Sequence, residues 1–181
     1  MAGKKKKSYW NDIEKKLNKY EKKQLIDLLS DLYQLSSTNK IFLNTRFSAG
    51  DDPLVSYKRI IQKAIHPYLE DNEPLEMEIA DDAIRQYCKA TDNPIGEAEL
   101  RIFYMESGNN FTLSYGDIDE DFYESLLEMY EYAIETVLKL SVQEQNTFRA
   151  RLHKIMKSAS GIGWGYYDGL CDLYYKAFPE D

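Results

Sequence analysis

Hydrophobic residues recur at helical spacing along almost the whole chain. In the segment 22–33, Leu25, Leu28 and Leu32 share one face, whereas Asp27 and Asp31 lie on the other. Such an apolar stripe is typical of a helix that packs on a core. The same reading along the chain predicts eight or nine amphipathic helices, over about residues 11–19, 22–34, 41–47, 53–65, 74–91, 95–107, 119–140, 142–158 and 165–177.

Several of these helices have clear start signals. Asp52 is a capping carboxylate and Pro53 follows it at the first helical position. Ser141 and Glu144 form the capping-box pattern, with Ser at the cap and Glu three residues later. Further boundaries are expected at the proline or glycine clusters 73–74, 93–94, 108–110 and 161–165.

Residues 111–115 break the helical pattern. Hydrophobic and polar residues alternate here, and no partner strand is evident elsewhere in the sequence. We therefore expect an extended connector that ends at Gly116.

These elements predict an all-α fold, with the amphipathic helices packed antiparallel in one globular domain over residues 8–181. Residues 1–7 are expected to form a disordered basic tail. Stacking of the helices as in HEAT or TPR repeats is an alternative arrangement. The sequence, however, has no self-similarity at the period of about 34–47 residues that such repeats have.

The composition limits the environment of the protein. With 43% hydrophobic and 30% charged residues, the chain is typical neither of a disordered protein nor of a membrane protein. No apolar run approaches the roughly 20 residues of a membrane span. The two cysteines, Cys88 and Cys171, form neither a metal-ligand spacing nor a disulfide framework. We therefore expect a cytoplasmic protein that does not associate with membranes and needs no cofactor.

The charge is unevenly distributed. Residues 1–23 carry a net charge of +6, and the remaining residues carry −14. An acidic body repels nucleic acid, so nucleic acid is an expected partner only through the lysine-rich arm. If that arm binds phosphates, the chain is a nucleic-acid accessory protein; otherwise the arm is a solubilising tail. The lysines are Lys4–Lys7, Lys15, Lys16, Lys19, Lys22 and Lys23.

An acidic segment at 117–128 is the candidate for metal chemistry. Its oxygen-bearing residues fall at the ligand positions of a calcium-binding EF-hand loop: Asp117, Asp119, Asp121, Ser125 and Glu128. However, Phe122 occupies the position at which that loop requires glycine. The alternative is that acidic residues gather at the positive end of a helix dipole. A metal-binding protein or hydrolase centred on this segment is thus the second functional hypothesis.

The first functional hypothesis is a protein-interaction or scaffold module without catalytic activity. The sequence contains no convergent set of catalytic side chains, and its fifteen tyrosines suit helix interfaces and partner surfaces equally. Trp164, Tyr166 and Tyr167, beside a glycine-rich turn, are the candidate residues for contacting another protein or a second copy.

Packing and turn patterns occur at 25–33, 39–46, 57–61, 115–117, 163–170 and 174–175. Through these patterns the chain resembles, over about residues 15–178, a family of small bacterial proteins labelled as a domain of unknown function. It implies a bacterial cytoplasmic setting. It supplies no activity, cofactor or catalytic residue.

Overall fold

The structure, a computed structural model, describes residues 9–50, 52–67 and 74–179, and helices are the only regular secondary structure in that part of the chain. The helices are α1 (Tyr9–Leu17), α2 (Lys22–Leu35), α3 (Ser37–Arg46), α4 (Pro53–Ile65), α5 (Met77–Ala90), α6 (Pro94–Tyr115), α7 (Glu120–Val137), α8 (Val142–Ser158) and α9 (Tyr166–Ala177). The prediction of an all-α fold is confirmed. The predicted tail at 1–7 lies outside the described residues. Among the helices described, none is both long and apolar enough to cross a membrane.

By its internal contacts the chain divides into two compact units, residues 1–43 (unit 1) and 44–181 (unit 2). In unit 1, neither α1 nor α2 contains a buried residue. Both helices are amphipathic, and their apolar faces are open to solvent. Trp10, Leu29 and Leu35 are 59%, 46% and 76% exposed. Unit 1 therefore contributes little core of its own.

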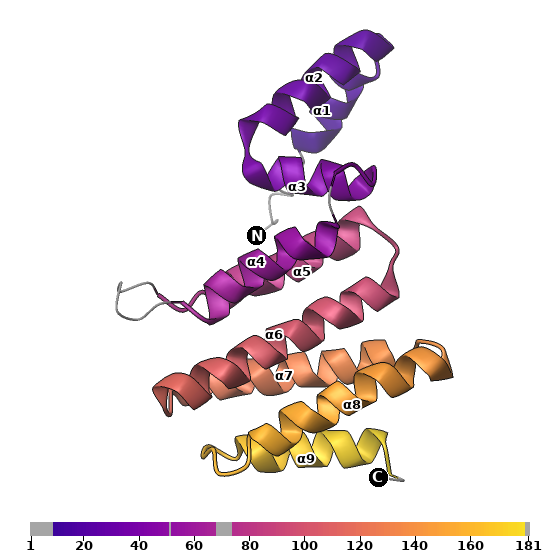
Figure 1. Cartoon of the computed structure of the whole chain (residues 1–181). Helices are drawn as coiled ribbons and strands as arrows, with labels where there is room; N and C mark the ends of the chain where they lie inside the picture. The colour runs from indigo at the N-terminus through magenta and orange to yellow at the C-terminus, as the bar shows by residue number, and fades with distance from the viewer. Residues whose placement is uncertain (1–8, 51, 68–73, 180–181) are drawn as a thin grey trace, which may run out of the picture. The chain divides into compact units, whose positions relative to one another are not determined.

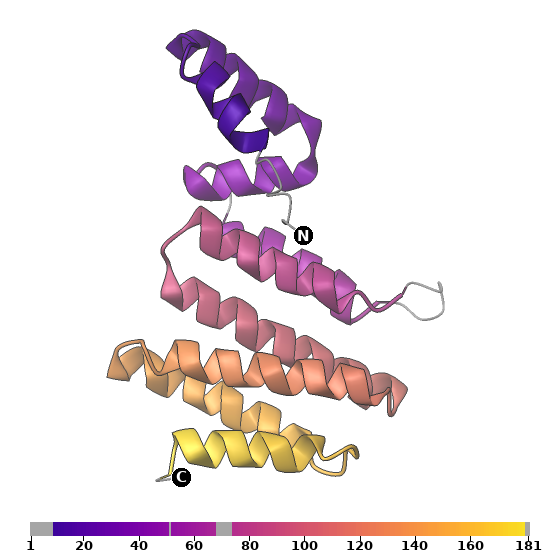
Figure 2. The ribbon, with the colours of Figure 1, turned by 180° about the vertical axis from the view of Figure 1, so that it is seen from behind.

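Unit 2 is a stack of helices in two layers (Figures 1 and 2). Helix α6 packs between α4 and α8 in one layer, and α7 packs against α9 in the other. Consecutive helices run in opposite directions across the stack, and each also packs against the next one along the chain. The stacking is therefore repeat-like in space, although no repeat is visible in the sequence.

Tyrosine is the main large residue of the core of unit 2. Seven of its tyrosines are almost fully buried: Tyr57, Tyr87, Tyr104, Tyr123, Tyr130, Tyr166 and Tyr174. A buried phenol needs a hydrogen-bond partner. The hydroxyl of Tyr130, for example, donates to the backbone oxygen of Leu152 over 3.0 Å and so joins α7 to α8. Much of the high tyrosine content therefore serves the core.

The predicted helix end at 108–110 and the predicted connector at 111–115 are wrong, because α6 runs without a break through both. Gly108 is buried at the contact with α7, where a Cβ would lie 2.4 Å from Cδ2 of Leu126. Asn109 is buried and hydrogen-bonded to α8. Both residue types stop helices when they face solvent. Here they allow the neighbouring helices to approach closely, and the helix continues.

The predicted start signals of three helices are confirmed. The side chain of Asp52 accepts from the backbone N–H of Leu54, and that of Asn93 accepts from Gly96. Ser141 and Glu144 form a reciprocal capping box. Each cap satisfies backbone donors that the first turn of a helix leaves unpaired.

Helix α5 begins at Met77, three residues after the predicted start at Pro74. The backbone N–H of Glu76 donates to the carbonyl oxygen of Ala64, 2.9 Å away near the end of α4. This tertiary hydrogen bond holds Glu76 outside the helix, and only a contact between distant residues could supply it.

We expect Gly108→Ala to lower the free energy of unfolding by about 1 kcal/mol. Overpacking a core costs roughly 1–3 kcal/mol, and the better helix propensity of alanine returns about 1 kcal/mol of that. Leu126 cannot move away freely, because it is itself fully buried. Urea denaturation monitored by circular dichroism measures the change.

Gly163→Ala is the matched control, since the nearest atom to its added Cβ lies 3.9 Å away. Its stability should stay within about 0.5 kcal/mol of the wild type. A Gly108→Ala protein as stable as this control would contradict the role of Gly108 as a close-approach residue.

Candidate functional site

A polar hollow of about 370 Å³ lies across α4, α6 and α8 of unit 2. These three helices face the viewer in Figure 1. We call this feature the α4–α6–α8 hollow. It is lined by Gln62, Phe103, Glu106, Ser107, Asn109, Asn110, Arg151, Lys154, Ile155 and Ser158.

A chain of ion pairs joins the three helices beside the hollow. Lys58 of α4 donates to Glu99 of α6 over 2.5 Å. Arg151 of α8 donates to both oxygens of Glu106, over 2.9 and 2.8 Å, and also to Glu99. The four side chains are only 21–34% exposed. Because Arg151 bridges two carboxylates of α6, the network fixes the positions of α6 and α8 relative to each other.

The network also keeps its central groups ionised. Burial alone would raise the pKa of Glu99, but hydrogen bonds from Lys58 and Arg151 together with their charges lower that pKa below its ordinary value. Burial would lower the pKa of Arg151, but its hydrogen bonds to Glu106 and Glu99 raise that pKa. Glu99 and Arg151 therefore both carry full charge at neutral pH.

A second, uncharged network forms the floor of the hollow. The amide nitrogen of Asn109 donates to the backbone oxygen of Ile155 over 2.9 Å and to Oγ of Ser158 over 3.0 Å. The amide oxygen of Asn109 accepts from the hydroxyl of Tyr166 on α9. A single buried side chain thus joins α6 to α8 and α9.

The rim of the hollow has polar groups with spare bonding capacity. Asn110 and Lys154 are exposed, and within the described residues neither side chain takes part in a hydrogen bond or an ion pair. Gln62 is exposed as well, and its oxygen accepts from Ser107 over 3.4 Å. Each of the three helices therefore contributes one donor that is free to bind a ligand: an amide on α4, an amide on α6 and an ammonium on α8.

The predicted metal ligands are not brought together as a metal site. They are Asp117, Asp119, Asp121 and Glu128. Asp119 caps α7 by accepting from the N–H of Phe122 over 2.9 Å, and Asp117 accepts from the hydroxyl of Tyr123 over 3.3 Å. Glu128 lies two turns further along α7. Among the described residues, no three or more His, Cys, Asp or Glu side chains are placed to hold a metal ion.

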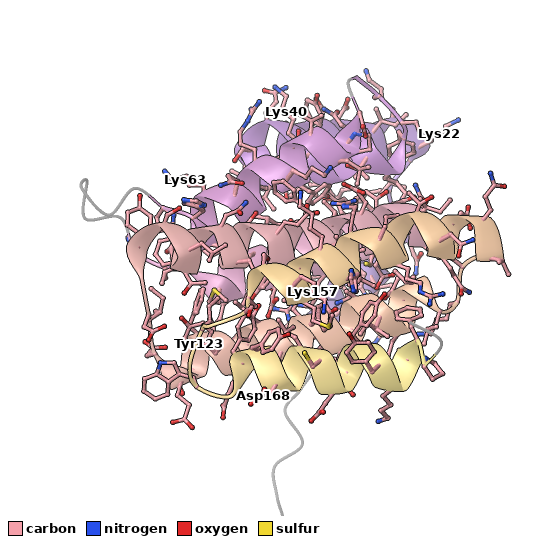
Figure 3. The ribbon with its side chains drawn as sticks, turned by 60° about the horizontal axis from the view of Figure 1, so that its bottom comes forward. Lys22, Lys40, Lys63, Tyr123, Lys157 and Asp168 are labelled. Carbon is pink, nitrogen blue, oxygen red and sulfur yellow. The ribbon has the colours of Figure 1, made fainter. Side chains whose placement is uncertain are left out.

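The predicted partner residues have different environments. Tyr166 is fully buried and donates a hydrogen bond to Asn109 beneath the hollow, so in this structure it offers no surface to a partner. Trp164 is 56% exposed and has a left-handed backbone (φ +59°), and Tyr167 is half-buried. Trp164 lies in the α8–α9 loop and Tyr167 lies in the first turn of α9. The loop lies near the α6–α7 turn, as a Cβ added at Gly163 would be 3.9 Å from Asp117. Tyr123 and Asp168 are labelled on α7 and α9 in Figure 3.

The residues of the hollow did not emerge from the sequence. They come from three helices, and no two of the helices are adjacent along the chain. The only local signal was the presence of charged residues, such as Glu99 and Glu106, between strongly buried positions of α6. That signal indicates a partner on another helix without identifying it.

We expect Arg151→Met to lower the free energy of unfolding at pH 7 by about 1–2 kcal/mol, since it leaves two half-buried carboxylates without their common partner. A lowered pKa of Glu99 gives stability that is present above the ordinary carboxyl pKa and lost as the pH falls. The loss between about pH 5 and pH 3 should therefore be smaller in the variant than in the wild type. Urea titrations across that range test this.

Arg85→Met is the matched control, because Arg85 and Asp82 form a pair that is about 60% exposed on both sides. Its cost should stay below about 0.5 kcal/mol. Equal costs for the two substitutions would show that the network beside the hollow has no special importance.

Comparisons with known proteins give one result. No curated protein and no solved structure matches the chain. The family model of DUF6155 matches residues 8–173, which is most of the chain. The resemblance to a domain of unknown function is thereby confirmed, and the chain belongs to DUF6155, a family of unknown function.

Proposed function

We propose that this protein is a helical interaction module without catalytic activity, and that its α4–α6–α8 hollow binds an extended segment of another protein. The observation that carries the proposal is a locally basic, amide-rimmed hollow on an otherwise acidic unit. Three steps support it: the charge of the hollow, the bonding capacity of its rim and the rigidity of its base.

The charge of the hollow is opposite to that of the unit around it. Residues 44–181 contain 13 basic and 26 acidic residues, a net charge of −13. The lining of the hollow contains Arg151 and Lys154 against Glu106 alone. A carboxylate on the partner would therefore be attracted to the hollow and repelled by the rest of the surface, so its position is selected electrostatically.

The rim suits a peptide backbone. Gln62 and Asn110 each carry a carboxamide, which can donate to a carbonyl oxygen and accept from an N–H of the same peptide. They lie on α4 and α6, which pack side by side. Phe103, a half-buried residue of the lining, offers an apolar contact to a partner side chain. Lys154 would then pair with an acidic side chain of the segment.

The base of the hollow is already rigid before any partner binds. The ion pairs around Arg151 and the hydrogen bonds of Asn109 hold the helices in place. A rigid surface loses little conformational entropy on binding, which favours affinity. The free cysteines Cys88 and Cys171 support a reducing compartment, the cytoplasm, as the place where this binding occurs.

The triple variant Gln62→Ala, Asn110→Ala, Lys154→Glu tests the proposal. All three residues are exposed on the rim, so the fold should be unaffected. Tagged protein is recovered from its native cells, and co-purifying proteins are quantified by mass spectrometry. We expect one set of partners to fall at least tenfold with the variant, which corresponds to about 1.4 kcal/mol of binding free energy.

The control makes the same three types of change at exposed positions of α8 outside the hollow: Gln143→Ala, Asn146→Ala and Lys157→Glu. It should recover the same partners as the wild type. Equal recovery with both triple variants, or no specific partner with the wild type, would reject the hollow as a binding site.

A further inference from the structure

Helix α1 of unit 1 carries an apolar stripe that the described structure leaves open. Trp10, Ile13 and Leu17 follow one another at intervals of three and four residues and so share one helix face. Trp10 is 59% exposed and Ile13 is 48% exposed. Lys16 and Glu14 flank this stripe on opposite sides, by the same helical spacing.

Unit 2 carries an apolar groove of about 240 Å³ between α7 and α9. We call it the α7–α9 groove. Its apolar lining consists of Ile134, Leu138, Leu173 and Ala177, and its charged rim consists of Glu131 and Glu135 on α7 and Lys176 on α9. It lies in the layer opposite the one that α4, α6 and α8 form, so it is separate from the hollow proposed above.

The acidic rim extends along almost the whole of α7. Asp121, Glu124, Glu128, Glu131 and Glu135 follow at intervals of three and four residues, and all five are exposed. They form a single stripe over four turns. Residues 117–135 contain eight acidic residues and no basic one. This surface favours a cationic partner and disfavours an acidic one.

We propose that α1 of a second copy of this chain docks in the α7–α9 groove. The apolar stripe of α1 would lie on the apolar lining, as an amphipathic helix does in a hydrophobic groove. Lys16 would face the glutamates of α7, and Glu14 would face Lys176 of α9. The helix and the groove thus both offer apolar surface to the contact, and the charges that flank them are opposite in sign.

The opposite net charges of the two units favour the contact between α1 and the groove. Residues 1–43 have a net charge of +5, and residues 44–181 have −13. Lys22 and Lys40, labelled in Figure 3, are both exposed on unit 1. An anionic lipid surface would also attract this basic, apolar helix, but it would repel the larger and more strongly charged unit 2 of the same molecule. Unit 2 of a second copy also carries a net charge of −13, so the feature that favours a second copy is the local match of its apolar groove and acidic rim to α1.

The contact is heterologous, because one molecule contributes the helix and the other contributes the groove. In analytical ultracentrifugation of the full-length chain, we expect the average mass to rise with concentration up to about 100 µM, where a contact with a micromolar Kd is largely occupied. Association should weaken at least tenfold when salt is raised from about 0.05 to 0.5 M, because the flanking charges are exposed.

Two variants separate the partners of the contact. The helix variant, Trp10→Glu with Ile13→Glu, removes the apolar stripe and keeps the groove; α1 has no buried residue, so the fold of unit 2 should be unaffected. The groove variant, Leu138→Lys with Leu173→Lys, does the reverse. Each should be monomeric alone. Mixed in equal amounts, they should form a one-to-one dimer and nothing larger, because only one productive contact remains.

The controls carry the same charge changes on other surfaces. Asn11→Glu with Asn18→Glu adds the same charge away from the apolar stripe of α1, and Leu113→Lys with Val142→Lys alters exposed apolar positions outside the groove. Both should associate as the wild type does. Circular dichroism melts confirm that all variants are folded.

Three results would overturn the proposal. The wild type stays monomeric across the concentration range, the two variants fail to dimerise when mixed, or the controls lose association as the variants do. Monomeric wild type that binds vesicles of phosphatidylserine and phosphatidylcholine, but not vesicles of phosphatidylcholine alone, would identify an anionic lipid surface as the partner of α1 instead. The peptide-binding hollow is unaffected by any of these outcomes, because no substituted residue lines it.

Discussion

The burial of α6 is the constraint on which the rest of unit 2 depends. This helix packs against α4, α5, α7 and α8, and most of its surface is buried apart from the face that lines the hollow. The approach of α7 requires the absence of a side chain at Gly108, and Asn109 joins α6 to α8 and α9. A helix that packs against four neighbours must carry apolar, small or hydrogen-bonded residues on each side that faces a neighbour.

The two layers of unit 2 present surfaces of different chemistry. On the layer of α4, α6 and α8, Arg151 and Glu99 belong to an ion-pair network, while Lys154 at the rim is free to bind. On the other layer, α7 exposes a continuous acidic stripe beside an apolar groove. The tyrosines fill the space between the layers. A rigid core with two chemically distinct faces is an arrangement suited to binding other chains.

The accuracy of the sequence predictions follows the range of the interactions behind them. The caps at Asp52 and Ser141 were predicted because each involves residues within one helical turn. The end of α6 was predicted wrongly at Gly108 and Asn109. Glycine and asparagine can either stop a helix or line an interface, and the residue type alone does not distinguish the two roles. Tyr166 was proposed as a partner contact, yet its hydroxyl is used by Asn109, 57 residues earlier in the chain. No local pattern contains that information.

The amino-acid sequence alone determined the all-α class, most helix positions, the start signals and the separation of a basic N-terminal part from an acidic remainder. These properties depend on helical periodicity, capping and charge counts, which act over a few residues or need no structure at all. Only the tertiary structure decided which polar side chains meet. The rotation of each helix about its own axis, set by packing against several neighbours at once, brings Gln62, Asn110 and Lys154 to one hollow and places the acidic residues at 117–128 in separate roles.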